Sequence, residues 1–307
     1  MRGSTDLSEA VPAGEPAGEP SAWSRRTVAV GDVHLAVITA GPRDGPLLLL
    51  LHGFPEGARC WRHQIDALAR AGYRVWAPDQ RGYGESDKPG PVSAFRLDRL
   101  VADALGLLDA AGSARACVVG HDWGGAVAWW MAQTAPERIE RLVILNCPHP
   151  GVMRRALITR PRQMLRSWYI ALFQLPWLPE ALASFAGHRL LCWGLTSSSR
   201  DGTFTDADLQ AYRTAWLRPG ALRAMLHWYR ALRLRLPPAP AGRIAVPTLL
   251  LWGALDRALG RELAGPSVDR CEQGRLVFLD QASHWLQHEE PDRVNSLILE
   301  HLRPPSR

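Results

Sequence analysis

The sequence predicts an α/β protein, in which a mostly parallel sheet is flanked by helices and interrupted by an inserted helical segment. Six short aliphatic runs without polar alternation recur along the chain, which is typical of strands buried on both faces. Helical patterns separate most of these runs. The alternation stops between residues 151 and 240, where no clear strand pattern is found.

The expected elements follow one another in a simple order. A hairpin over residues 27–39 turns at Gly31 and Asp32. The six aliphatic runs follow at residues 47–51, 73–77, 116–119, 141–145, 248–252 and 276–279. Leucines and alanines at helical spacing predict a helix over residues 97–111, which Gly112 ends. These elements place the core in residues 23–150 and 241–307.

The two remaining segments differ from this core in composition. Residues 1–22 hold the sequence Pro-Ala-Gly-Glu twice in succession and predict a disordered tail. Residues 151–240 are rich in Trp, Leu and Arg and predict a helical cap, with a Pro-rich exit linker at residues 237–240. This cap holds thirteen arginines and four acids, a net charge of +9, whereas the whole chain carries +6. Because no nucleic-acid-binding motif accompanies this charge, we expect a solvated surface and no nucleic-acid partner.

Composition excludes several classes of protein. Hydrophobic residues make up 47% and charged residues 21% of the 307 residues, which is ordinary for a globular chain. No run of about 18 uncharged apolar residues occurs, so we expect a cytoplasmic protein with no integral membrane segment. Lys88 is the only lysine and lies outside any phosphate-binding loop, and no Cys-x-x-Cys pair is present. We therefore expect neither a cofactor nor a metal ion.

One segment combines a strand, a sharp turn and a helix in the arrangement that presents a nucleophile. Residues 120–125 read Gly-His-Asp-Trp-Gly-Gly and follow the aliphatic run at 116–119. The glycines allow a tight turn and a close approach of helix and strand, and Asp122 occupies the apex. A purely structural turn, with Asp122 as a helix cap, is the alternative.

An aspartate at this apex predicts a particular reaction. A carboxylate has an ordinary pKa of about 3.9, so it is an anion at neutral pH without the help of a base. It can displace a leaving group from a saturated carbon and form an ester of the enzyme, which water can then hydrolyse. A serine alkylated in the same way would become an inert ether. Asp122 therefore indicates displacement at carbon followed by ester hydrolysis.

The second step needs a base, a group that orients it, and donors for an oxyanion. His284 follows the last aliphatic run and is the expected base, while Asp256 follows the preceding run and would orient it. The chain order Asp122, Asp256, His284 is the nucleophile, acid, base order of this arrangement. The backbone N–H groups of Phe54 and Trp123 are the expected oxyanion hole.

In these and neighbouring motifs the chain resembles the α/β-hydrolases of the soluble epoxide hydrolase group. The matching motifs are His-Gly-Phe-Pro-Glu at residues 52–56, Asp-Gln-Arg-Gly-Tyr-Gly-Glu-Ser at 79–86, the turn at 120–125, and Ser-His-Trp at 283–285. The resemblance extends over about residues 30 to 300. It implies an α/β-hydrolase fold with an inserted helical cap, and the conversion of an epoxide to a vicinal diol.

The resemblance also implies two cap tyrosines that donate hydrogen bonds to the epoxide oxygen. Tyr169 and Tyr229 lie in matching segments and would take this role. Ring opening leaves an alkoxide, which is a poor leaving group unless donors stabilise its charge. For either tyrosine alone, packing as a partly buried amphipathic residue is an equally good interpretation.

A substrate pocket is expected around these groups, and we assign five residues to it. The assigned residues are His52, Pro55, Trp168, Trp228 and Trp285. His52 is also expected to hold a loop in place. The Trp-rich cap suggests an apolar or aromatic epoxide, although some of these rings must pack the cap onto the core. A monomer and a homodimer are both compatible with the sequence.

The sequence is also compatible with two other functions. Haloalkane and fluoroacetate dehalogenases use the same Asp-His-Asp set, and Trp123 would suit halide binding. However, Phe54 stands where haloalkane dehalogenases usually carry an Asn, and Trp123 and Ala126 stand where fluoroacetate dehalogenases carry arginines. The second alternative is a non-catalytic binder on the same fold, although every expected catalytic group is present.

Overall fold

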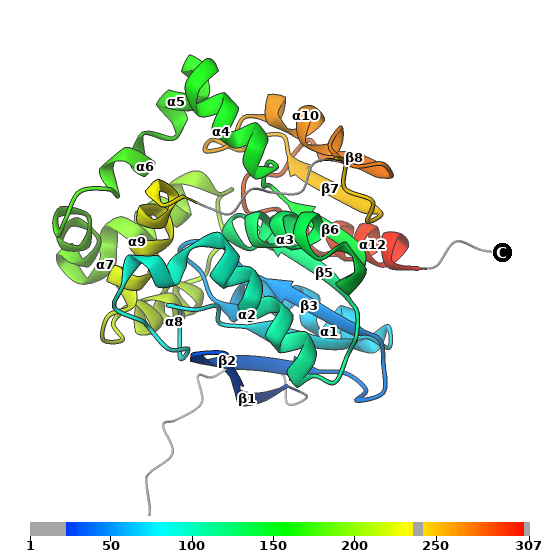
Figure 1. Cartoon of the computed structure of the whole chain (residues 1–307). Helices are drawn as coiled ribbons and strands as arrows, with labels where there is room; N and C mark the ends of the chain where they lie inside the picture. The colour runs from blue at the N-terminus through cyan, green and yellow to red at the C-terminus, as the bar shows by residue number, and fades with distance from the viewer. Residues whose placement is uncertain (1–22, 236–241, 304–307) are drawn as a thin grey trace, which may run out of the picture.

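The computed structural model describes residues 23–235 and 242–303. The tail predicted at residues 1–22 and the linker predicted at 237–240 lie outside the described residues. An eight-stranded sheet forms the centre of the fold, in the order β1-β2-β4-β3-β5-β6-β7-β8 (Figure 1). Its strands are β1 (Ser24–Val30), β2 (Val33–Ala40), β3 (Leu47–Leu51), β4 (Arg74–Pro78), β5 (Ala116–His121), β6 (Ile139–Leu145), β7 (Thr248–Gly253) and β8 (Gly274–Leu279).

The prediction of a mostly parallel sheet is confirmed. β4, β3, β5, β6, β7 and β8 pair in parallel, whereas β1 and β2 pair antiparallel with each other and β2 pairs antiparallel with β4. All six aliphatic runs lie on strands, and the expected hairpin forms β1 and β2. The carboxyl ends of the parallel strands therefore meet at one edge of the sheet.

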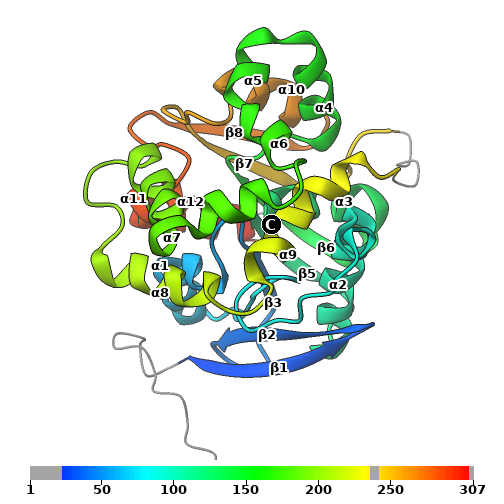
Figure 2. The same cartoon turned by 90° about the vertical axis from the view of Figure 1, so that its left-hand side faces the viewer.

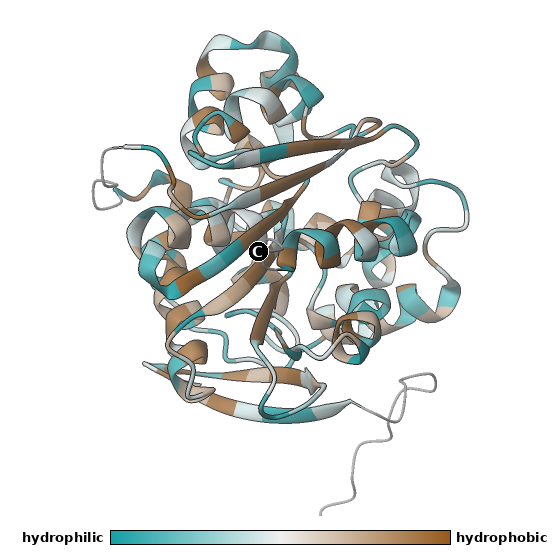
Figure 3. Cartoon of the chain, turned by 90° about the vertical axis from the view of Figure 1, so that its right-hand side faces the viewer, coloured by the Kyte–Doolittle hydropathy of each residue, from teal (hydrophilic) through white to brown (hydrophobic). Residues whose placement is uncertain are grey.

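Helices cover both faces of this sheet. On one face lie α2 (Leu97–Ala110) and α3 (Trp123–Thr134), and on the other α1 (Arg62–Arg70) and α12 (Pro291–Leu302). β3 shows why its sequence is apolar throughout: Leu49 and Leu51 pack in one core cluster, while Leu48 and Leu50 pack in the other. Successive side chains of a strand point to opposite faces, so a strand between two helical layers needs apolar residues at every position. Figure 3 shows mostly hydrophobic strands between helices that carry both hydrophobic and hydrophilic residues.

The segment between β6 and β7 is helical, as the sequence predicts. It contains α4 (Pro150–Thr159), α5 (Pro161–Arg166), α6 (Trp168–Leu172), α7 (Leu178–Ser198), α8 (Asp206–Trp216) and α9 (Ala221–Arg230) (Figure 2). Shorter elements complete the described fold: α10 (Ala264–Val268), α11 (Leu286–Glu289), and the 3-10 turns η1 (Ala58–Trp61), η2 (Val92–Phe95), η3 (Pro136–Arg138), η4 (Ala231–Arg233) and η5 (Arg261–Leu263). None of the helices in the described segments combines the length and apolar character that crossing a bilayer requires.

Two indole groups fasten this helical segment to the rest of the fold. The Nε1–H group of Trp228 in α9 donates to the carbonyl of Arg81 at 3.0 Å, and that of Trp216 in α8 donates to the carbonyl of Pro55 at 2.7 Å. Both rings are buried. Each ring therefore buries a large apolar area without leaving its polar group unpaired.

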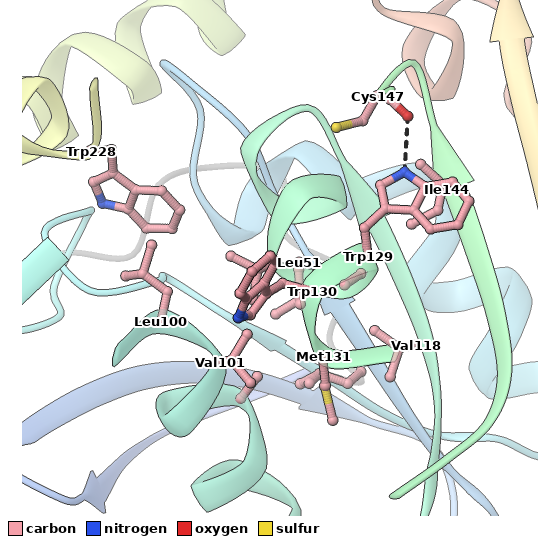
Figure 4. Close-up of a cluster of buried hydrophobic side chains, with 14 of the residues drawn as sticks. Leu51, Leu100, Val101, Val118, Trp129, Trp130, Met131, Ile144, Cys147 and Trp228 are labelled. Atoms are coloured by element: carbon pink, nitrogen blue, oxygen red, sulfur yellow. Dashed lines mark hydrogen bonds between the residues drawn. The ribbon is translucent and has the colours of Figure 1, made fainter. Parts of the chain in front are cut away.

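The core next to the sheet is built around α3, which is buried along most of its length. Trp129 of this helix is fully buried, and its Nε1–H group donates to the carbonyl of Cys147 at 3.0 Å (Figure 4). This hydrogen bond joins α3 to the segment that follows β6.

The five cysteines of the chain are all buried free thiols.

We expect Trp129→Phe to destabilise the protein, because it leaves the carbonyl of Cys147 without its donor and opens a void beside the sheet. The expected loss in the free energy of unfolding is about 1–3 kcal/mol, measured by urea denaturation. Trp193→Phe is the matched control, since Trp193 is 64% exposed in α7, and we expect a change within about 0.5 kcal/mol. Equal effects of the two substitutions would contradict this account of the core.

Candidate active site

Polar side chains that are distant in sequence meet at the carboxyl edge of the parallel sheet. Asp122 follows β5, Asn146 follows β6, Asp256 follows β7 and His284 follows β8, while Phe54 follows β3. This is the edge at which parallel sheets bind ligands, because the loops after neighbouring strands converge there. The structure brings together Asp122, Asp256 and His284, the three residues predicted as nucleophile, acid and base.

Asp122 occupies a backbone turn that few residues adopt. Its φ is 49° and its ψ is −120°, between the end of β5 and the start of α3. Such a positive φ costs energy in a residue with a side chain and persists only where the surroundings enforce it. A Cβ atom on Gly124 would lie 2.1 Å from the carbonyl oxygen of Leu51, so α3 approaches the sheet as closely as only glycine permits. The side chain of Asp122 makes no capping hydrogen bond to α3 and is 18% exposed.

The two carboxylate oxygens of Asp122 have different surroundings. The backbone N–H of Phe54 donates to Oδ1 at 2.9 Å, and the backbone N–H of Trp123 also bonds the carboxylate. Oδ2 lies 3.7 Å from Nε2 of His284. Burial raises the pKa of Asp122, an effect that the charge of His284 and the two backbone donors partly oppose. Oδ1 is therefore held by one of the expected oxyanion donors, Phe54, while Oδ2 faces the expected base.

His284 is oriented by Asp256. Nδ1 of His284 and Oδ2 of Asp256 are 2.7 Å apart, and the backbone N–H groups of Ala258 and Leu259 each donate to Oδ1 at 2.8 Å. Burial alone would raise the pKa of Asp256, but the charge of His284 and these hydrogen bonds lower it. Burial would likewise lower the pKa of His284, but the charges of Asp256 and then Asp122 raise it to about 9. His284 is therefore an imidazolium at neutral pH while Asp122 is unmodified.

Asn146 belongs to this arrangement, and the sequence reasoning missed it. Its Nδ2 donates to Oδ2 of Asp256 at 2.6 Å, and its Oδ1 accepts from the backbone N–H of Gly253 at 2.7 Å. Its φ of 41° turns the chain immediately after β6. A signal was present, since Asn146 directly follows one of the aliphatic runs at the ligand-binding edge of the sheet.

A second group of buried polar residues lies behind His284 and was also missed. The Glu56 carboxylate accepts from the hydroxyl of Tyr212 in α8, and lies 2.8 Å from Nε2 of His288. Burial would raise the pKa of Glu56, but the charge and hydrogen bond of His288 lower it to about 2. The ring of His121 stands 3.9 Å from Glu56 and bonds the carbonyl of His284 at 2.9 Å. Glu56 thus connects the helical segment to the loop that carries the expected base.

Both predicted tyrosines lie near the Asp122 carboxylate. The ring of Tyr229 in α9 is buried and contacts those of Phe54 and Trp123, with centroids 5.3 Å and 5.1 Å away. The ring of Tyr169 in α6 lies 6.0 Å from that of Tyr229. Burial and then the charge of Asp122 raise the pKa of both phenols. Both hydroxyl groups therefore keep their protons at neutral pH and remain donors.

The five residues assigned to the pocket occupy different environments. Trp228 and Trp285 are buried, with ring centroids 5.7 Å from Trp123 and 4.9 Å from His284 respectively. Pro55 is buried, and its carbonyl accepts from Trp216. His52 is fully buried: its Nδ1 lies 3.0 Å from the carbonyl of Gly53, and its Nε2 accepts from the backbone N–H of Gln80 after β4. Both ring nitrogens are therefore occupied by backbone groups. Trp168 is 63% exposed and lies on the surface of α6.

Taken together, the residues offer a carboxylate nucleophile, an oriented imidazole, two backbone donors and two phenol donors. Among residues 23–235 and 242–303, no three His, Cys, Asp or Glu side chains form a group that could hold a metal ion. A carboxylate, an imidazole and phenols arranged in this way can carry out nucleophilic substitution and proton transfer.

Comparison with known proteins agrees with this fold. A model of the alpha/beta hydrolase fold matches residues 46–291. The chain is 48% identical over 271 residues to the AB hydrolase superfamily protein YfhM of Bacillus subtilis, covering 88% of this chain and 95% of that protein. It is 40% identical over 276 residues to human epoxide hydrolase 4, covering 88% of this chain and 76% of that protein.

Solved structures lead to the same family. The crystal structure of a mutant of an epoxide hydrolase from Bacillus megaterium superposes with a TM-score of 0.82 at 31% identity, covering 90% of this chain and 99% of that one. Epoxide hydrolase A from Mycobacterium thermoresistibile superposes with a TM-score of 0.80 at 33% identity, covering 92% and 98%. On these matches the chain belongs to the α/β-hydrolase family, in its epoxide hydrolase group.

Proposed function

We propose that this protein hydrolyses an epoxide to a vicinal diol through an ester formed on Asp122. The observation that carries the proposal is the position of this carboxylate, with Oδ1 bonded to the backbone of Phe54 and Oδ2 facing His284. No cofactor takes part in the proposed reaction. The helices α4 to α9 act as a cap that brings Tyr169 and Tyr229 to the site.

In the first step, Oδ2 of Asp122 attacks one carbon of the epoxide and the bond from that carbon to the ring oxygen breaks. The ring oxygen receives a proton from Tyr169 or Tyr229 and becomes a hydroxyl group. The tyrosinate left behind is reprotonated through solvent by the proton that His284 gives up once Asp122 is no longer charged, so both tyrosines are again phenols and His284 is neutral. Because both phenols have raised pKa values, they stay protonated until a charge develops on the substrate. Donors placed where charge appears in the transition state are the most effective form of electrostatic catalysis.

In the second step, His284 takes a proton from water, and the resulting hydroxide adds to the carboxyl carbon of the ester. The oxyanion forms on Oδ1, to which the N–H group of Phe54 donates, and the N–H group of Trp123 is the second proposed donor. The ester bond then breaks, the diol leaves and Asp122 is again a carboxylate. Alkylation removes the negative charge of Asp122, one of the causes that raise the pKa of His284. Formation of the ester therefore lowers the pKa of His284 and favours its action as a base in the second step.

Dehalogenation uses the same three residues and is the second candidate. The N–H group of an indole could bind a released halide, and Trp123 lies next to the nucleophile. The pair of phenols, with Tyr229 buried and Tyr169 partly buried, favours the epoxide, because an alkoxide needs proton donors whereas a halide leaves as a stable anion. A cytoplasmic location, an apolar or aromatic substrate and the oligomeric state remain predictions from the sequence.

We expect His284→Gln to trap the ester, because attack at carbon does not need the base whereas hydrolysis does. With styrene oxide as the probe, intact-protein mass spectrometry should show an increase equal to one molecule of the epoxide, and peptide mapping should place it on Asp122. The Asp122→Ala variant should show no adduct under the same conditions. An adduct that persists in the Asp122→Ala variant, or none in His284→Gln, would overturn the proposed intermediate.

We expect Tyr169→Phe and Tyr229→Phe each to slow the alkylation step by about a hundredfold, the typical cost of losing one donor to a developing oxyanion. Single-turnover kinetics with styrene oxide measures this step. Tyr73→Phe is the matched control, because Tyr73 is a half-buried tyrosine beside β4, and its rate should match that of the parent. If the two tyrosine variants release halide from a haloalkane at the rate of the parent, the phenols are needed for epoxide opening and not for displacement in general. Unchanged rates of epoxide opening in both variants would contradict the proposed role of the two tyrosines.

The raised pKa of His284 predicts a loss of stability at alkaline pH. The pKa of His284 lies near 9 in the folded protein, above the ordinary value of 6.5, so the protonated group stabilises the folded state. This contribution is complete below about pH 6.5 and is lost as the pH rises through about 9. We expect the Tm of the parent to fall more steeply over this interval than that of His284→Gln, as measured by calorimetry. Parallel curves for the two proteins would show that the pair with Asp256 does not stabilise the fold.

A further inference from the structure

Large apolar side chains are exposed on one part of the helical segment. Among the described residues, eleven of the fourteen exposed large hydrophobic side chains lie between residues 158 and 193. Six of these are 63–75% exposed and define what we call the outer apolar face: Ile158, Leu165, Trp168, Trp177, Phe185 and Trp193. They belong to α4, α5, α6 and α7 and the turn before α7, and Figure 2 shows α5, α6 and α7 on the side that faces the viewer. Exposed apolar area on this scale indicates an interaction surface.

Arginines share the helix sides that carry this outer apolar face. Arg154 lies four residues before Ile158, and Arg189 lies four residues before Trp193, so each pair is adjacent on its helix. Five arginines here are exposed and have no hydrogen-bond or ion-pair partner among the described residues: Arg154, Arg155, Arg162, Arg166 and Arg189. Elsewhere in the described residues some exposed arginines are paired, as Arg275 is with Glu300, but here five unpaired ones lie within 36 residues of the chain. The surface thus combines apolar side chains with unneutralised positive charge.

We infer that the outer apolar face docks onto the surface of an anionic lipid bilayer. Indole rings favour the boundary between headgroups and acyl chains, where their apolar body and polar N–H group are both accommodated. Guanidinium groups beside them are attracted to anionic headgroups, and each adds affinity while it lies near the surface. The three exposed tryptophans and five unpaired arginines therefore match both layers of such a surface.

Charge disfavours a second copy of this chain as the occupant. A symmetric dimer through this face would bring the same five arginines of both copies together. Glu180 is the one acidic residue between positions 151 and 200, and it already pairs with Arg230 at 2.6 Å. The face therefore offers no acidic group to balance the arginines of a partner copy. An anionic bilayer supplies the complementary charge that a second copy lacks.

Docking through this face would serve the proposed chemistry without depending on it. The outer apolar face and the tyrosines Tyr169 and Tyr229 belong to the same helical segment, so docking would hold the segment that carries both tyrosines against the bilayer. Apolar epoxides partition into bilayers and would be taken up from there. The inference goes beyond the proposed function, because binding to vesicles can be measured with no substrate present.

Co-sedimentation of the full chain with vesicles tests the inference. The probes are vesicles of phosphatidylglycerol mixed with phosphatidylcholine and vesicles of phosphatidylcholine alone. We expect the parent to bind the mixed vesicles, more weakly as salt is raised, and to bind the neutral vesicles poorly. Replacing three arginines, as R154Q/R162Q/R189Q, should weaken binding about a hundredfold, since each arginine near the surface contributes about fivefold. Trp177→Ser with Trp193→Ser should also weaken it, by about tenfold or more.

Two control variants separate the face from general surface properties. R43Q/R70Q/R293Q removes the same charge from exposed arginines on other elements, and Leu217→Ser with Leu255→Ser removes exposed leucines outside the face. Both should bind as the parent does, and all variants should keep the parent Tm. Absence of parental binding to the anionic vesicles, or equal losses in the control variants, would overturn the inference. So would a parental dimer that dissociates in the tryptophan variant and binds no vesicles.

Discussion

The turn at Asp122 is the constraint on which the rest of the site depends. A φ of 49° in a residue with a side chain persists here because β5 and α3 are fixed on both sides and Gly124 lets α3 lie against the carbonyl of Leu51. This turn presents a carboxylate whose Oδ1 accepts from the backbone of Phe54 and whose Oδ2 faces His284.

The charges of Asp256, His284 and Asp122 stabilise one another in turn. Asp256 is held ionised by His284, by two backbone donors and by Asn146, and it holds His284 as an imidazolium in turn. That cation stabilises the buried charge of Asp122 in the resting protein. Esterification of Asp122 removes a negative charge next to the imidazolium, so the proton on Nε2 becomes easier to lose. The same pair of groups can therefore stabilise the nucleophile first and activate water afterwards, without any movement of the backbone.

How much the sequence could predict depends on how local each signal is. The strands were predictable because a strand covered on both faces needs continuous apolar sequence, as in Leu47–Leu51. The candidate nucleophile, acid and base could be named from the sequence because each follows such a strand, and the structure brings the three side chains together. Glu56 and Asn146 were not assigned roles, because their importance arises from partners far along the chain: Glu56 meets Tyr212 and His288, and Asn146 meets Asp256. The residues that neighbour Glu56 and Asn146 in the sequence give no indication of these distant partners.

Exposure was the least predictable property, and the tryptophans of the helical segment show why. Trp228 and Trp168 both lie in helices of this segment. Trp228 is buried and its N–H group donates to the carbonyl of Arg81, whereas Trp168 is 63% exposed. α9 is covered by the core along one side, so its aromatic residues meet Phe54 and Trp123. α6 and α7 lie farther from the sheet (Figure 1), and the rings of Trp168 and Trp193 are exposed there. A helical segment with aromatic residues on both its inner and its outer sides is suited to two contacts at once, one with the catalytic carboxylate and one with a surface outside the protein.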